Sequence, residues 1–300
     1  MTTKIIGSAL LVLALPALCL AEPRSSAAWA AEFYNHVRIV PNIDYKDTPQ
    51  GPQLLDVFQS RDWPGPAPTV FMIHGGGWIH GSKEDMLGYV MPWLEMGWSV
   101  VSINYRVARE ASAPAGVEDC FAALRWTVAN AKSNNLDLSH MVIAGASAGG
   151  HLALVVGLAP ESAGFDLDPR GGPLPKAAAI VNFSGVSDVL DLFRGPHRQD
   201  FTAAWLGKQP DPEALARRLS PLTYVRPGVP PVFTAHGDHD ATVPYEEAVR
   251  LHAALDGAGV SNQLYTIVGG KHGAYTPEEY RAIYAALRSF LVQHHLPIQP

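Results

Sequence analysis

The chain has 300 residues, of which 47% are hydrophobic and 17% are charged, a composition typical of one large globular domain with a substantial core. Acidic residues outnumber basic ones by 28 to 22 and no basic run occurs, which argues against a nucleic-acid partner. The sequence also contains no repeat with a period of about 20–50 residues, so a solenoid or propeller is excluded.

Residues 1–21 have the pattern of a secretory signal peptide rather than of a folded element. Lys4 is the only charge, Ile5–Leu20 is an apolar run, and Cys19–Ala21 offers small residues at the cleavage positions. We therefore expect cleavage after Ala21 and a mature protein, residues 22–300, that is secreted or periplasmic.

Two alternatives for this segment are weaker. A membrane anchor would need a longer run than this one, which Pro16 interrupts. A lipoprotein site at Cys19 would place bulky Leu18 where such sites use a small residue. Cleavage would leave Cys120 as the single cysteine, without an internal disulfide. Because Cys120 adjoins an apolar helical stripe, we expect a core thiol rather than a nucleophile.

The first half of the chain predicts alternating strands and helices. A short helix is expected first, followed by an antiparallel strand pair and then by buried apolar strands separated by helices. In chain order these elements are a helix over 27–38, strands over 37–43 and 54–58, a strand over 69–73, a helix from 82 to 95, a strand over 99–105, a helix around the stripe Val117, Phe121, Leu124 and Val128, and a strand over 141–143 followed by a helix.

The second half continues the pattern after one interruption. A buried strand is expected over 177–183 and further strands over 232–235 and 263–268, with helices over 245–255 and 276–290. Between them, residues 184–231 form a long irregular excursion, which we expect to act as a cap or lid. Strand–helix alternation of this kind predicts an α/β doubly wound fold with helices on both faces of a mostly parallel sheet and ligands at the carboxyl ends of its strands.

Two glycine-rich turns carry the chemistry. Gly145–Gly149 fits G-x-S-x-G directly after a strand, so Ser147 would occupy a strained strand-to-helix turn with helix N–H groups behind it. His74–Trp78, H-G-G-G-W, follows another buried strand, and three consecutive glycines indicate a close backbone approach. We interpret this second turn as an oxyanion loop.

A base and an acid follow in the order that a Ser–Asp–His hydrolase requires. His272 lies in a glycine-flanked loop between the last strand and the last helix, where it could accept the proton of Ser147. Asp238 and Asp240 compete for the acid. We favour Asp240 because it lies further beyond the strand end, and we expect Asp238 to be a hydrogen-bonding loop residue.

Other readings of these residues are less favoured. A metal site formed by His236, Asp238, His239 and Asp240 would need neighbours on one loop to converge without a further ligand, so no metal is expected. His151 follows the elbow on its helix and is predicted to be a packing residue rather than a second base.

Four motifs, taken in order, resemble those of the esterase/lipase branch of the α/β-hydrolases. They are H-G-G-G-W, Asn104-Tyr105-Arg106, G-A-S-A-G-G-H-L-A and H-G-D-H-D-A-T-V-P. Within it, the chain is most similar to small bacterial feruloyl/acetylxylan-esterase-like (BD-FAE-like) carboxylesterases, with kynurenine-formamidase-like proteins as neighbours. The resemblance implies that Gly76, Gly77 and Ala148 donate the oxyanion-hole N–H groups, and that Asp240 is the acid.

Two departures from the hormone-sensitive-lipase pattern weaken any transfer of lipid specificity. Ala146 precedes the serine where that group has aspartate, and Asp240–Pro244 differs from its D-P-L acid loop. We therefore expect a secreted serine esterase without a cofactor, acting on short-chain, aryl or sugar-linked esters, including esterified polysaccharide. An amidase or formamidase is the alternative, and a non-catalytic binding protein is a remoter one. We expect Trp78, Phe193 and Trp205 to line the substrate pocket.

Overall fold

The computed structural model describes residues 26–168 and 172–299, and the chain divides into two compact units, Met1–Asn35 and His36–Pro300. The described part of the first unit belongs to helix α1 (Ser26–His36), close to the bounds expected for a short helix there. The predicted signal peptide, residues 1–21, lies outside the described residues.

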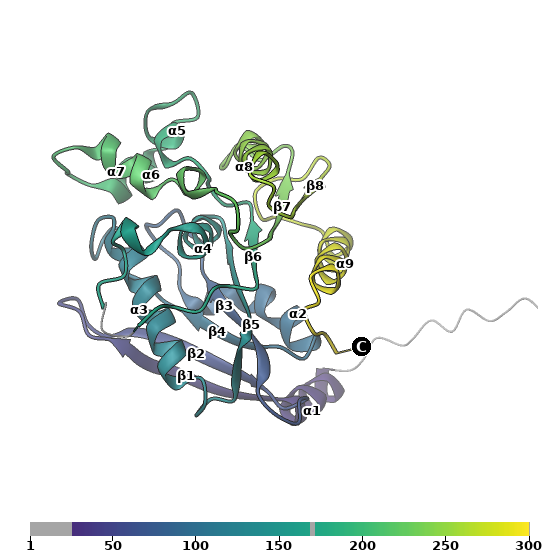
Figure 1. Cartoon of the computed structure of the whole chain (residues 1–300). Helices are drawn as coiled ribbons and strands as arrows, with labels where there is room; N and C mark the ends of the chain where they lie inside the picture. Colours follow the sequence, from purple (N-terminus) through teal and green to yellow (C-terminus); the bar gives the residue numbers. More distant parts are fainter. Residues whose placement is uncertain (1–25, 169–171, 300) are drawn as a thin grey trace, which may run out of the picture. The chain divides into compact units, whose positions relative to one another are not determined.

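The second unit is built on a mixed sheet of eight strands, most of them parallel (Figure 1). The spatial order is β1-β2-β4-β3-β5-β6-β7-β8, in which β2 pairs antiparallel with both β1 and β4 while the other pairs are parallel. The strands are β1 (Val37–Lys46), β2 (Gln53–Ser60), β3 (Ala67–Ile73), β4 (Ser99–Ile103), β5 (Leu136–Ala146), β6 (Ala179–Phe183), β7 (Val232–Gly237) and β8 (Asn262–Ile267). The predicted α/β architecture is confirmed.

Helices flank the strands on both sides in Figure 1, with α3 and α4 on one side and α2 and α9 on the other. The main helices are α2 (Leu87–Glu95), α3 (Ala115–Asn130), α4 (Ala148–Leu158), α8 (Tyr245–Gly257) and α9 (Pro277–Gln293). A capping box begins α9, because the Thr276 side chain accepts from the Glu279 N–H while the Glu279 carboxylate accepts from the Thr276 N–H. Within residues 26–168 and 172–299, no helix is both long and apolar enough to cross a membrane.

One predicted helix differs from the structure. The segment after Ser82 begins as a 3-10 turn, η1 (Lys83–Met86), before α2 starts at Leu87. The Ser82 N–H donates to the Asp85 carboxylate, while the Lys83 N–H donates to the Asn104 side chain. The first turn is therefore held by another part of the chain as well as by its own residues.

The 184–231 excursion is more ordered than its sequence pattern predicts. It contains three short helices, α5 (Val189–Arg194), α6 (Asp200–Leu206) and α7 (Pro212–Leu219), and the 3-10 turn η4 (Pro221–Tyr224). Its two ends meet, since the Leu222 N–H donates to the Ser187 carbonyl at 3.1 Å, and buried Glu247 of α8 accepts from the Ser187 N–H at 2.8 Å. A long insertion is thus closed at its base onto the sheet domain.

The parallel register brings the ends of several strands to one edge of the sheet. Ile73 pairs with Gly145 across β3 and β5, and Ala146 pairs with Phe183 across β5 and β6. The loops that follow these strands therefore start side by side, which is where ligands bind in parallel α/β sheets. The central strands β3, β4, β6 and β7 are buried along their whole length, whereas the edge strands β1 and β8 are partly exposed.

Candidate active site

Ser147 lies in a strained turn between β5 and α4. Its backbone has φ 56° and ψ −121°, in the positive-φ region that residues other than glycine rarely adopt, and its N–H donates to the Phe183 carbonyl at 2.7 Å. A Cβ at Gly145 would lie 2.2 Å from the Gly149 carbonyl oxygen, and one at Gly149 would lie 2.1 Å from that of Ile73. Both glycines of the motif are therefore required by close backbone contacts, as the sequence predicted.

Three polar side chains from separate loops meet at this turn. The Oγ of Ser147 lies 2.8 Å from Nε2 of His272, and Nδ1 of the same ring lies 2.6 Å from Oδ2 of Asp240. A carboxylate can only accept, so Nδ1 carries a proton and Nε2 is left to accept the serine hydroxyl. The arrangement meets the geometric requirement for general-base activation of a serine.

The Asp240 carboxylate is buried and has four donors. Oδ1 accepts from the N–H groups of Thr242 at 2.8 Å and Val243 at 2.9 Å, while Oδ2 accepts from His272 and lies 3.3 Å from Nε2 of His236. Burial by itself raises the pKa of Asp240, but the hydrogen bonds from the two imidazoles and the loop amides outweigh it and hold this pKa well below its usual value. The side chain is therefore ionised at neutral pH.

The competing acid, Asp238, points elsewhere. Its Oδ1 accepts from the Gly269 N–H at 2.6 Å, and its own N–H donates to the Ile267 carbonyl at 3.2 Å. Asp238 therefore joins the loops that follow β7 and β8. Among the described residues, no group of three or more His, Cys, Asp or Glu side chains has an arrangement suited to a metal ion.

His236 contributes to the acid loop in a way that the sequence did not reveal. Its ring is fully buried, and Nε2 lies 2.9 Å from the Val243 carbonyl as well as near Asp240. The only sequence feature that could have indicated this contact is the position of His236 at a strand end, four residues before Asp240.

The glycine loop after β3 passes directly beside Ser147. A Cβ at Gly75 would lie 3.3 Å from the Ser147 Cβ, and φ is +105° at Gly76 and +59° at Gly77. None of the described residues accepts a hydrogen bond from the N–H groups of Gly76, Gly77 or Ala148. Because Ala148 is the first residue of α4, its N–H also lies at the positive end of a helix dipole.

Two of the three residues predicted to line the substrate pocket belong to the core. Trp78 and Trp205 are wholly buried and stack on one another with ring centroids 4.4 Å apart, so their assignment to an open pocket is wrong. Phe193 is half-buried on α5, where the Arg194 guanidinium lies 5.0 Å from its ring centroid. Because the indole ring is large and mostly apolar, burial of both rings in the core is favourable.

Phe201, on α6, lies against the glycine loop. Its Cγ would lie 3.3 Å from a Cβ at Gly77, and its ring is 5.8 Å from that of Trp78. Phe201 is only half-buried, so part of its ring faces solvent beside the loop. The 184–231 segment therefore contributes a side chain to the surroundings of the glycine loop, through α6.

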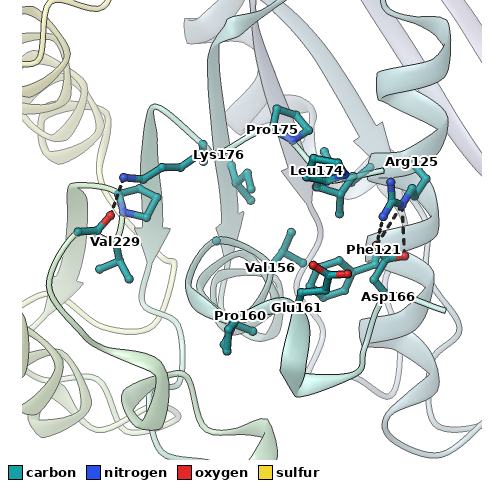
Figure 2. Close-up of a pocket in the computed structure, with 18 of the residues that line it drawn as sticks. Phe121, Arg125, Val156, Pro160, Glu161, Asp166, Leu174, Pro175, Lys176 and Val229 are labelled. Carbon is teal, nitrogen blue, oxygen red and sulfur yellow. Dashed lines mark hydrogen bonds and ion pairs between the residues drawn. The ribbon is translucent and has the colours of Figure 1, made fainter. Parts of the chain in front are cut away.

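A separate cavity of about 330 Å³ lies at another part of the domain (Figure 2). Phe121, Leu124, Ile143 and Val156 give it an apolar wall. Its cations are occupied by partners within the chain, since Arg125 pairs with Asp166 and the Lys176 ammonium donates to the Gly228 carbonyl (Figure 2). Neither Ser147 nor its two polar partners line this cavity, so it is distinct from the candidate active site.

Solved structures with the same fold include Thermogutta terrifontis esterase 2 phosphonylated by cyclosarin. It superposes with a TM-score of 0.72 at 25% sequence identity, covering 88% of this chain and 96% of that one. A bifunctional GH43-CE protein of Bacteroides eggerthii gives a TM-score of 0.72 at 27% identity, over 83% of this chain and 38% of that one. Both comparisons confirm the hydrolase fold that the motifs predicted.

Sequence comparison gives relatives and a family. Esterase LipC of Mycobacterium tuberculosis is 32% identical over 240 residues, which cover 76% of this chain and 58% of the relative. The chain thus spans less than two thirds of that relative's length. The BD-FAE family model matches residues 55–255, from β2 through nearly all of α8. Together with the fold and the motif order, this match means that the chain belongs to the BD-FAE family of the α/β-hydrolases.

Proposed function

We propose that this protein is a serine carboxylesterase that works through an acyl-enzyme. The observation that carries the proposal is the continuous hydrogen-bonded series from Ser147 through His272 to Asp240. Relatives named as esterases support the same reaction class. A non-catalytic binding role would not need a fully ionised acid and a correctly protonated imidazole behind a strained serine.

In the proposed reaction, Ser147 Oγ attacks the ester carbonyl while its proton moves to Nε2 of His272. The resulting imidazolium gives that proton to the departing alkoxide, and the alcohol leaves. Water then repeats the sequence on the acyl-enzyme, which releases the acid and restores the serine. Asp240 stays ionised throughout and stabilises the imidazolium.

The oxyanion of each tetrahedral intermediate would be held by backbone N–H groups. Those of Gly76, Gly77 and Ala148 have no acceptor among the described residues and belong to segments on either side of Ser147. Preorganised donors of this kind gain strength as charge develops on the carbonyl oxygen, and loss of one costs on the order of 10²–10³ in turnover.

We further propose that the substrates are esters with short acyl groups or with aryl or sugar components. Phe201 packs beside Gly77 and leaves limited room next to the oxyanion loop. The GH43-CE neighbour is compatible with a carbohydrate-linked ester, and the sequence of residues 1–21 supports export to where such esters occur. Small-molecule esters and esterified polysaccharide are thus the proposed partners.

The test is activity combined with covalent labelling. The mature protein should hydrolyse p-nitrophenyl acetate, and an organophosphate should add once, on the peptide that contains Ser147. Ser147→Ala should lower turnover by roughly 10³-fold or more and abolish the label. Full activity in this variant, or stoichiometric labelling of another residue, would overturn the mechanism.

A further inference from the structure

His151 lies at the junction of three elements that surround Ser147. It is on α4, four residues after the serine, and its ring has no solvent exposure. Nδ1 accepts from the indole N–H of Trp78 at 3.1 Å, and Nε2 donates to the Leu219 carbonyl of α7 at 2.7 Å. Since an indole N–H can only donate and a carbonyl can only accept, the ring is a neutral imidazole with its proton on Nε2.

The partner on one side, Trp78, belongs to the same loop as the oxyanion glycines. Its φ of 61° is costly for a bulky L-residue, so surrounding contacts must maintain it. Those contacts are the stacked ring of Trp205, the hydrogen bond to His151, and a hydrogen bond from the Ala108 N–H to the Trp78 carbonyl at 2.8 Å. The indole is therefore fixed in position and angle.

We propose that His151 is a positioning residue for the oxyanion loop: by accepting the Trp78 N–H, it holds the backbone of Gly76 and Gly77 beside Ser147. The effect is transmitted through one residue, because Gly77 and Trp78 are adjacent and both have positive φ. This inference rests on the proposed esterase function and assigns His151 no direct contact with substrate.

Two observations support this role over simple packing. Burial lowers the pKa of His151 to about 4, so Nδ1 remains an acceptor throughout the neutral range. The second hydrogen bond, to the Leu219 carbonyl at the end of α7, keeps the ring proton on Nε2 and so leaves Nδ1 to accept from Trp78. A hydrocarbon side chain would fill the space but leave the Trp78 N–H buried without an acceptor.

The test compares His151→Leu with His151→Asn. Asparagine places Oδ1 where the imidazole has Nδ1, so it keeps an acceptor for Trp78 and gives up the contact with Leu219. We expect the leucine variant to lose about tenfold or more in kcat with little change in KM, and the asparagine variant to stay close to the wild type. Trp78→Phe should cause a similar loss, and combining it with His151→Leu should add little, because both remove one interaction.

A second readout is independent of catalysis. Hydrogen exchange at the His80 amide, which donates to the Gly76 carbonyl, and at the Ala108 amide, which donates to the Trp78 carbonyl, should accelerate in His151→Leu and in Trp78→Phe but not in His151→Asn. This measurement tests the positioning role even if the wild-type protein hydrolyses no ester, an outcome that would refute only the proposed function. Thermal melts identify a variant that fails to fold, in which case the remaining two variants decide the question.

Two results would overturn the inference. Unchanged exchange and kcat in His151→Leu would show that the Trp78 bond does not position the loop. Equal damage in His151→Asn and His151→Leu would show that the acceptor is irrelevant and that His151 only packs.

Discussion

Acidification from pH 7 to pH 4.5 should destabilise this protein through two buried histidines. His74 and His151 are 1% and 0% exposed, and burial lowers the pKa of each from 6.5 to about 4. In the unfolded chain both rings take up a proton near pH 6.5, whereas in the folded protein they do so only near pH 4. Falling pH therefore favours the unfolded state across this window, and stability is regained as pH rises above it.

The size of the effect follows from the two pKa values. The gap between 6.5 and about 4 corresponds to about 3 kcal/mol for each ring when the window is crossed completely. Two rings together approach the total stability of many domains, about 5–15 kcal/mol. Glu247 acts in the opposite direction, because burial raises its pKa and its protonation on acidification favours the folded state, so it offsets part of the loss.

Urea unfolding at closely spaced pH values would measure this dependence. The midpoint for the wild type should fall as pH is lowered from 7 to 4.5, with a contribution of at most about 1.4 kcal/mol per pH unit from each histidine. His151→Asn should remove the contribution of one histidine, so the free energy of unfolding should depend less steeply on pH. The opposing contribution of Glu247 should stay in place. A flat wild-type curve, or an unchanged slope in the variant, would refute the reasoning.

Three further outcomes are expected. Asp240→Asn should cost on the order of 10⁴-fold in kcat because tautomer control is lost, while Asp238→Asn should cost far less; the reverse order would contradict the hydrogen bonding described above. On p-nitrophenyl esters, kcat/KM should be highest for acetate or butyrate and lower by about tenfold for decanoate, and Phe201→Ala should reduce that difference. A wild-type preference for decanoate would refute the argument for a small acyl pocket. If N-formylkynurenine were the best substrate, the protein would be a formamidase rather than an esterase. Edman sequencing of exported protein should begin at Glu22, whereas a start at Met1 would refute cleavage.

Local patterns were enough to predict the fold class and the three polar side chains that meet at the turn after β5. A continuous apolar strand such as β3 needs burial on both faces, and G-x-S-x-G suits a turn in which Gly145 and Gly149 contact neighbouring backbone. The order of Ser147, Asp240 and His272 along the chain, each after a strand, was sufficient because parallel strands end at one edge of the sheet. These features depend on short stretches of sequence and on the topology of parallel α/β sheets, which follows a small number of general rules.

Partners far apart in sequence were decided only by the tertiary structure. Trp78 and Trp205 are separated by more than a hundred residues, and no pattern around either one indicated that the two rings would stack in the core instead of facing substrate. The sequence likewise did not indicate which groups His151 and His236 contact. Their hydrogen bonds to Trp78 and Leu219, and to the acid loop, arise because packing of distant segments determines which polar atoms meet.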